Sequence, residues 1–130
     1  MTDPEFVEAF FAGRLPNKQF HHRDHLRLTW LVLRQYGRER GGRMITDGIR
    51  QFASAHGQAS RYHETMTQFW IWLVDHARLA RPRVTSFEDF LAAFPLALDK
   101  ALPFRHWTHE AMMRAAAREA WLEPDLVPLP

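Results

Sequence analysis

Apolar side chains recur along this chain at intervals of three and four residues, and no stretch shows the sustained alternation of a strand. Glycine and proline interrupt the pattern at spacings that suit helices. The pattern predicts an all-α, single-domain bundle of five to six helices. The expected helices cover residues 4–12, 22–36, 42–56, 60–79, a shorter one that opens at Ser86 and is perturbed at Pro95, and 108–121.

Residues that start and stop helices stand at the predicted boundaries. Gly37 and Gly57 follow two of the helices, and Ser60 and Thr108 are good N-cap residues for two others. Residues 123–130 contain three prolines and are too rich in proline for a helix. We therefore expect a helical domain over residues 1–122, followed by an extended tail on its surface.

Composition narrows the range of functions. The chain has 130 residues, 46% hydrophobic and 25% charged, which is typical of a folded globular domain. Seventeen Lys and Arg against 15 Asp and Glu leave a formal charge of +2, so strong attraction to nucleic acid or to an anionic membrane is not expected. The absence of cysteine excludes disulfides, thiolate zinc sites and a cysteine nucleophile.

No segment of the sequence has the pattern of a membrane span or a secretion signal. The longest apolar run, residues 69–74, falls far short of the ~20 residues that cross a bilayer. The first ten residues lack a basic region followed by an apolar one. A cytoplasmic location without membrane contact is the expected setting.

Histidines are the most informative residues of the sequence. At 100° per residue, His63 falls on the same helical face as Met66 and Trp70, which is the apolar stripe of its helix. His22 and His25 fall on the inward face of the helix over 22–36. Three imidazoles, each in a first helical turn, are therefore expected to point into the protein.

The expected topology brings these imidazoles together. Short connections make consecutive helices antiparallel neighbours, so the helices over 22–36 and 60–79 should run in the same direction. Their first turns would share one end of the bundle with the start of the last helix and with Arg105 and His106. This predicts a pocket lined by imidazoles, aromatic side chains and one arginine.

A divalent metal would relieve the cost of turning several imidazoles inward. A buried polar group without a partner costs ~1–3 kcal/mol, and neutral imidazole is a good ligand for zinc, iron, copper and nickel. The predicted ligands are His22, His25 and His63, with His21 as a substitute for His22. Three protein ligands and one vacant position are typical of a catalytic rather than a structural metal site.

Other residues of the pocket have predicted roles beside the metal. Glu64 could act as a general base, and Arg105 could bind an anionic group of the substrate and assist catalysis. The predicted substrate-binding residues are Tyr62, Thr67, Trp70, Arg105 and His106.

Simpler interpretations stay open for each of these residues. A histidine in a first turn often bonds a backbone group, and Asp24 and Glu64 suit a helix N-terminus without any function. Helix N-termini that face one pocket also favour an anion over a bare cation.

Three functions follow from these observations. The first is a small metal-dependent enzyme that acts on a small anionic or aromatic molecule, with a hydrolase, a lyase and an oxygenase as the candidate classes. The second is a non-catalytic module that binds a metabolite or a metal. The third is a protein-interaction domain that uses the tail and Trp72, with structural histidines.

The chain resembles a group of small bacterial helical proteins of uncharacterised activity, with the motifs FHHxDH and YHxTxTxxW. The resemblance spans most of the chain but implies no activity. The segments that carry it are Phe20-His21-His22-Arg23-Asp24-His25-Leu26, Tyr62-His63-Glu64-Thr65-Met66-Thr67-Gln68-Phe69-Trp70, Arg105-His106-Trp107 and Trp121-Leu122-Glu123-Pro124-Asp125-Leu126.

Overall fold

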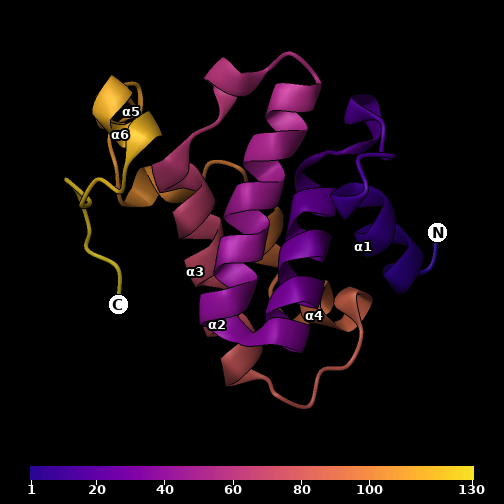
Figure 1. The fold of residues 1–130 in the computed structure, drawn as a ribbon. Helices are drawn as coiled ribbons and strands as arrows, with labels where there is room; N and C mark the ends of the chain where they lie inside the picture. The colour runs from indigo at the N-terminus through magenta and orange to yellow at the C-terminus, as the bar shows by residue number, and fades with distance from the viewer.

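The computed structural model describes residues 1–130 and consists of helices and loops without any strand (Figure 1). This confirms the predicted all-α fold. The α-helices are α1 (Asp3–Phe11), α2 (His22–Ala55), α3 (Glu64–Ala80), α4 (Phe87–Ala93), α5 (His109–Met112) and α6 (Ala115–Glu119). Short 3-10 helices are η1 (Asn17–Gln19), η2 (Ala59–Arg61), η3 (Pro95–Leu98) and η4 (Leu102–Arg105).

Helix α2 is a hairpin of two helical halves, residues 22–36 and 38–55, that pack side by side in opposite directions (Figure 1). The chain reverses at Gly37, whose φ of 81° and ψ of 176° belong to a region that only glycine adopts readily. Just beyond the turn, Gly41 lies so close to the first half that a Cβ there would stand 3.1 Å from the Val32 carbonyl oxygen. The sequence correctly predicted a helix end at Gly37, but it placed a loop where the second half already begins.

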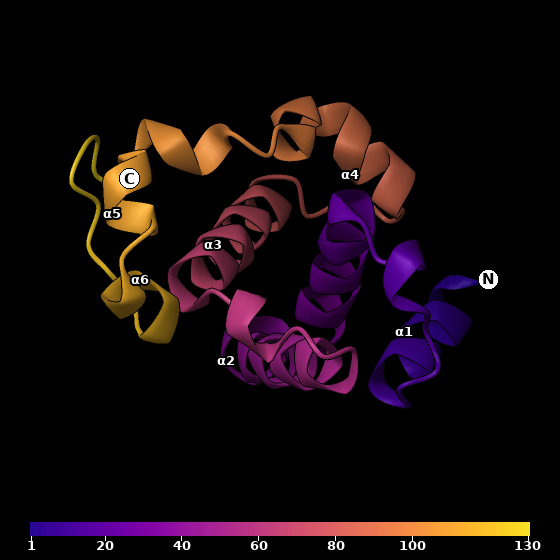
Figure 2. The ribbon, with the colours of Figure 1, turned by 90° about the horizontal axis from the view of Figure 1, so that it is seen from above.

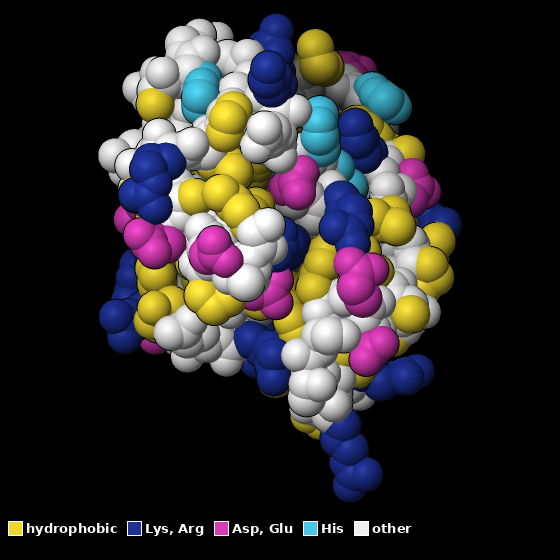
Figure 3. All heavy atoms as spheres, turned by 90° about the vertical axis from the view of Figure 1, so that its right-hand side faces the viewer, with side chains coloured by type: hydrophobic (Ala, Val, Ile, Leu, Met, Phe, Trp, Pro, Cys, Tyr) yellow, Lys and Arg dark blue, Asp and Glu magenta, His cyan; other side chains and the backbone are white.

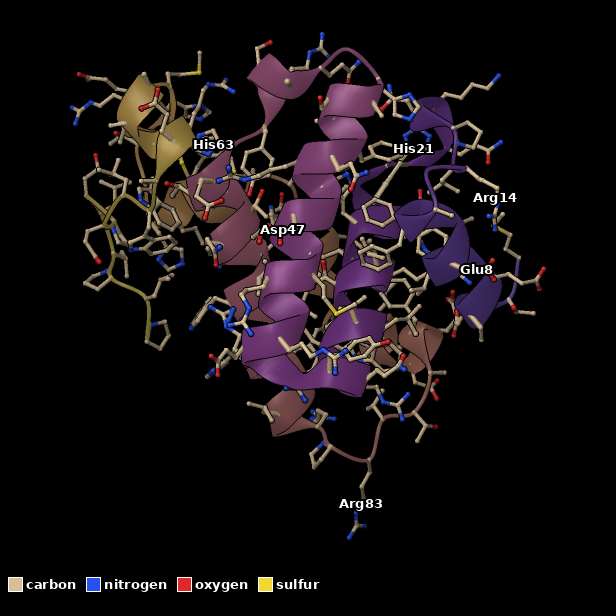
Figure 4. The ribbon with its side chains drawn as sticks, in the orientation of Figure 1. Glu8, Arg14, His21, Asp47, His63 and Arg83 are labelled. Carbon is tan, nitrogen blue, oxygen red and sulfur yellow. The ribbon has the colours of Figure 1, made fainter.

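Helix α3 runs back along the second half of α2, so the first turns of α2 and α3 lie at the same end of the molecule. Figure 4 shows His21 and His63 toward this end of the molecule, whereas Arg83 projects from the opposite end. The parallel direction predicted for these two helices is therefore correct. Figure 2 shows the segment from α4 to α5 passing along α3 on the side away from the second half of α2.

Two groups of buried side chains hold the helices together. The larger one joins α1, both halves of α2, α3 and α4, and contains 17 buried residues, among them Trp30 and Phe90. The smaller one has five buried residues and joins Phe69 of α3 to Trp107 and Met112. Burial of side chains of this size stabilises the fold by roughly 1.5–3 kcal/mol each, so α3 is fixed from both sides.

The C-terminal region differs from the single helix predicted over 108–121. The chain forms α5 and α6, separated at Arg114, which has an extended ψ of 143°. The break lets α6 fold back on α3, where the buried Thr65 hydroxyl lies 2.7 Å from the Ala117 carbonyl oxygen and 2.9 Å from that of Ala120. A hydroxyl fifty residues earlier in the chain thus selects this arrangement, which helix periodicity could not reveal.

The tail over residues 123–130 contains no helix and is held against the domain. The Asp125 carboxylate accepts hydrogen bonds from the backbone N–H and the hydroxyl of Thr108, at 2.9 and 2.7 Å. The Leu126 N–H donates to the carbonyl oxygen of His106 at 2.9 Å. Among the helices, none combines the length and apolar character that a membrane span requires.

Candidate functional site

A cavity of about 410 Å³, which we call the histidine cavity, lies between the first turns of α2 and α3. The second half of α2 supplies part of its apolar wall, including Ile49 and Phe52, and Trp70 of α3 supplies another part. The polar side chains of the lining are Asn17, His22, His25, Thr29, Gln58, Arg61, Tyr62, His63, Thr67 and Lys100.

The three histidines predicted to meet do line this one cavity. They come from separate stretches of the chain, and the hairpin of α2 places His22 and His25 at the same end as His63. On the α1 side of the molecule, histidine side chains gather in the upper part of the surface beside Lys and Arg side chains (Figure 3). The substitute ligand His21 is exposed and is not part of the cavity lining.

The fold uses both ring nitrogens of His63. Its Nδ1 accepts a hydrogen bond from the Met66 N–H at 3.1 Å and thereby caps α3, which begins at Glu64 rather than near Ser60. Its Nε2–H donates to the Met112 carbonyl oxygen at 2.8 Å and ties α5 to α3. His63 therefore has the structural role that a histidine in a first turn often has.

These two bonds leave His63 without a lone pair for a metal ion. No group of three His, Cys, Asp or Glu side chains is arranged to hold a metal. The set of His22, His25 and His63 predicted as ligands is thus present at one cavity but is not assembled for coordination. Metal binding through His22 and His25 stays a prediction.

His22 is partly committed to the fold. Its Nε2–H donates to the Ala97 carbonyl oxygen at 2.9 Å, which leaves Nδ1 as an acceptor, and its ring packs edge-on against Trp70 at 4.5 Å between centroids. Burial lowers the pKa of His22, the hydrogen bond to Ala97 opposes this, and the charge of Lys100 lowers it further.

His25 is the imidazole that the fold leaves open. Its ring packs against Phe20 at 4.0 Å between centroids, and its nitrogens take part in no hydrogen bond with the protein. Every polar side-chain atom that is fully buried has a hydrogen-bond partner. The His25 nitrogens have no partner, so they are not fully buried, and they face the cavity. Burial lowers the pKa of His25 to about 4, helped by the charge of His22 and opposed by Asp24. At neutral pH the ring is uncharged and can donate and accept.

Glu64 does not face this cavity, which corrects its prediction as a catalytic base. Its carboxylate accepts hydrogen bonds from Tyr62 at 2.5 Å, Gln68 at 3.0 Å and Arg50 at 3.2 Å. Burial would raise the pKa of Glu64, but these bonds outweigh it and hold the pKa below the usual value. A carboxylate that is ionised and fully engaged is a poor proton acceptor.

The hydroxyl of Tyr62 belongs to the same hydrogen-bond network. Burial and the hydrogen bond to Glu64 raise the pKa of Tyr62 to about 12, so the phenol keeps its proton. Tyr62 and Trp70 nevertheless line the cavity, as does Thr67, whose hydroxyl donates to the His63 carbonyl oxygen at 2.8 Å. These three residues predicted to bind substrate therefore line the cavity, and their binding role stays a prediction.

Arg105 and His106 lie elsewhere, which corrects the prediction that they share the histidine cavity. They line a separate, apolar pocket next to Phe69. The helical rotation of about 100° between Phe69 and Trp70 places these neighbours on different cavities. The His106 Nδ1–H donates to the Val127 carbonyl oxygen at 2.7 Å, so this side chain anchors the tail.

Two cations at the cavity were missed by sequence reasoning. Arg61 and Lys100 are exposed, and neither side chain takes part in an ion pair or a hydrogen bond. No Asp or Glu lines the cavity. Arg61 directly precedes the Tyr62–His63 pair and could have been found from that position. Lys100, one of only two lysines in the chain, comes from a loop with no local signal.

Comparison with known proteins adds no assignment: no protein-family model, curated protein or solved structure matches the chain.

Proposed function

We propose that the protein binds a small organic anion with an aromatic or apolar body in the histidine cavity. The observation that carries this proposal is the lining: open imidazole nitrogens and two unpaired cations, with an apolar wall and no carboxylate. A volume of about 410 Å³ lies in the range of roughly 300–1,000 Å³ that small-molecule sites occupy.

Each part of the lining has a distinct role in this proposal. Lys100 and Arg61 attract the carboxylate of the ligand, because the cavity contains no acidic side chain to neutralise them. The neutral His25 ring and Nδ1 of His22 offer hydrogen bonds to a polar substituent. The rings of Phe52 and Trp70 cover the body of the ligand.

Benzoate is a suitable probe, with uncharged benzamide as its matched control. We expect isothermal titration calorimetry to detect benzoate and to give benzamide an affinity about tenfold lower, because the amide forgoes the attraction of two cations. Lys100→Gln should remove most of the preference for benzoate. Lys18 is the second lysine of the chain and lies outside the cavity, so Lys18→Gln should leave both affinities unchanged. Equal affinities for the two probes, or no binding of either, would overturn the proposal.

Metal-dependent catalysis is a second candidate, and one observation favours it. His22 and His25 stand three residues apart on one helix, and both line the cavity with a ring nitrogen that makes no hydrogen bond to the protein. These two side chains would hold zinc, iron, copper or nickel, and the metal would supply a Lewis acid to the bound anion.

Metal analysis of the untagged protein separates the two candidates. If His22 and His25 bind a metal, the double variant His22→Ala/His25→Ala should lose it. His63→Asn should keep it, because asparagine is a good N-cap residue and His63 has no free lone pair. Equal metal content in the wild type and the double variant would exclude this ligand pair.

A further inference from the structure

A second pocket, which we call the Arg105 pocket, lies on the other side of α3. It has a volume of about 570 Å³, and eleven of its fifteen lining residues are hydrophobic. Its walls come from α3, α4, η3, η4 and the tail. Phe69, Phe90 and Ala97 form buried parts of the wall, whereas Leu96 and Val127 are 55% and 61% exposed.

The position of this pocket explains why it is open. Phe69 belongs to the smaller core cluster, whereas Phe90 and Ala97 belong to the larger one. The two clusters come together along α3 but do not fill the space between them, and the pocket occupies that space. Apolar side chains that would be covered in a continuous core therefore face a hollow, which an apolar molecule could fill.

The polar content of the Arg105 pocket is small and of one sign. Arg105 is the only charged side chain in the lining, and it takes part in no ion pair and no side-chain hydrogen bond. No Asp or Glu lines the pocket. His106 is held by its Nδ1–H bond to the Val127 carbonyl oxygen. A single free guanidinium therefore stands beside an otherwise apolar surface.

From this combination we propose that the Arg105 pocket binds an aliphatic carboxylate, with its chain along Phe69, Phe90 and Leu96 and its carboxylate on Arg105. A guanidinium pairs well with a carboxylate because its N–H groups match the two oxygens. An uncharged apolar ligand would leave Arg105 unused. A polar ligand would leave the apolar walls in contact with water or with unpaired polar groups. The proposal does not depend on what the histidine cavity binds.

Decanoate and decanol, which share a chain length and differ in the head group, test this proposal on the full chain below their aggregation concentrations. We expect calorimetry to give decanoate an affinity about tenfold higher than that of decanol, in keeping with one charge-assisted contact. Arg105→Gln should bring decanoate down to the affinity of decanol without changing decanol. Arg83→Gln, which removes an exposed arginine outside this pocket, should change neither.

A variant that fills the pocket gives an independent readout. Ala93→Trp places a large side chain at the edge of the Arg105 pocket, at a half-buried position at the end of α4, and should abolish binding of both molecules. Lys100→Gln should leave decanoate binding intact, which separates this proposal from that for the histidine cavity. Thermal unfolding of each variant verifies that it folds, and Arg105→Gln decides the question if Ala93→Trp does not.

Three results would overturn the proposal. The first is equal affinity for decanoate and decanol, and the second is unchanged decanoate binding in Arg105→Gln. The third is a dimer in sedimentation experiments that Ala93→Trp disrupts, because the Arg105 pocket would then be covered by a second copy of the chain.

Discussion

The histidine cavity and the Arg105 pocket lie on two sides of α3 and differ in chemistry. The first has nine polar residues besides Tyr62 among its nineteen lining residues, and the second is apolar except at Arg105 and His106. The difference begins with neighbouring residues of α3, because Trp70 faces the histidine cavity and Phe69 faces the Arg105 pocket.

The polar residues at these cavities divide into those whose hydrogen-bonding atoms have partners within the fold and those whose atoms have none. His63 uses both ring nitrogens, and Tyr62 donates its hydroxyl hydrogen to Glu64. His25 and Lys100 have no such partners. If the two proposals are correct, binding in the histidine cavity should respond to the protonation of His25, whereas binding in the Arg105 pocket should depend on apolar contact and the charge of Arg105.

The largest expected effect concerns His63, which the fold uses fully. His63→Ala removes the cap of α3 and leaves the Met112 carbonyl oxygen without its donor, so we expect unfolding in urea to require about 4 kcal/mol less. His63→Asn should recover part of this by restoring the cap. The exposed His76 serves as the control, since His76→Ala should cost less than about 0.5 kcal/mol. Equal stabilities of His63→Ala and His76→Ala would contradict the structural role of His63.

The second effect concerns acid stability and arises from His25. Its pKa in the folded protein is about 4, below the value near 6.5 of an unfolded chain. Between these two values the unfolded chain binds a proton that the folded chain does not, so stability falls as the pH falls through this window. The loss amounts to about 3 kcal/mol at most. His22 adds to it in the same direction, since its pKa is also lowered.

The charges around His25 support this direction. His22 on the same helix disfavours the imidazolium of His25 and Asp24 favours it, while Lys100 and Arg61 line the same cavity and no Asp or Glu does. Urea unfolding of the wild type and of His25→Gln at pH 7, 6, 5 and 4.5 measures the effect. The two proteins should lose stability at different rates as the pH falls, with the wild type the more sensitive. Parallel pH profiles would show that His25 is not the responsible group.

The third effect distinguishes the two cavities by the pH dependence of binding. An anion beside His25 raises its pKa, typically by 1–3 units, so benzoate affinity should increase by about tenfold from pH 7 to pH 5. His25→Gln should remove this increase. Decanoate affinity at the Arg105 pocket should change much less between pH 5.5 and 7.5, because its carboxylate pairs with an arginine, which does not titrate there. A shared pH dependence of both probes would mean that they bind at one place.

The smallest effect would pass through the hydrogen bond that links a residue of one cavity to a residue of the other. The Ala97 carbonyl oxygen accepts the hydrogen bond of His22, and Ala97 also lines the Arg105 pocket. Decanoate should therefore shift the NMR resonances of the His22 ring, while benzoate affinity changes less than about twofold. A larger shift at the His63 ring than at the His22 ring would contradict this route.

Local patterns were sufficient to predict much of this structure. Periodicity gave the helical class, and the turn at Gly37 followed from a glycine at the end of an amphipathic segment. The meeting of His22, His25 and His63 followed from helix faces and alternating helix directions. These features depend on residues within one helix or on simple topology, which a sequence displays directly.

The parts that could not be predicted depend on contacts between distant residues. The partner of His63 is a backbone carbonyl 49 residues away, and that of His22 is 75 residues away. Arg105 was assigned to the wrong cavity because it lies in a pocket with Phe69, which is on a different face of α3 from Trp70 and the histidine cavity. Lys100 reaches the histidine cavity from the loop between η3 and η4, which carries no local pattern that predicts a site.

The central claim is that His25 is open to a ligand while His63 is closed. Two-bond ¹H–¹⁵N NMR correlations of the imidazole rings, recorded at pH 6 during a benzoate titration, test it most directly. We predict that the His25 nitrogens shift toward the protonated form as benzoate binds, and that His63 keeps a fixed Nε2–H tautomer throughout. Saturation with benzoate that leaves His25 unchanged, or that changes the tautomer of His63, would contradict the account.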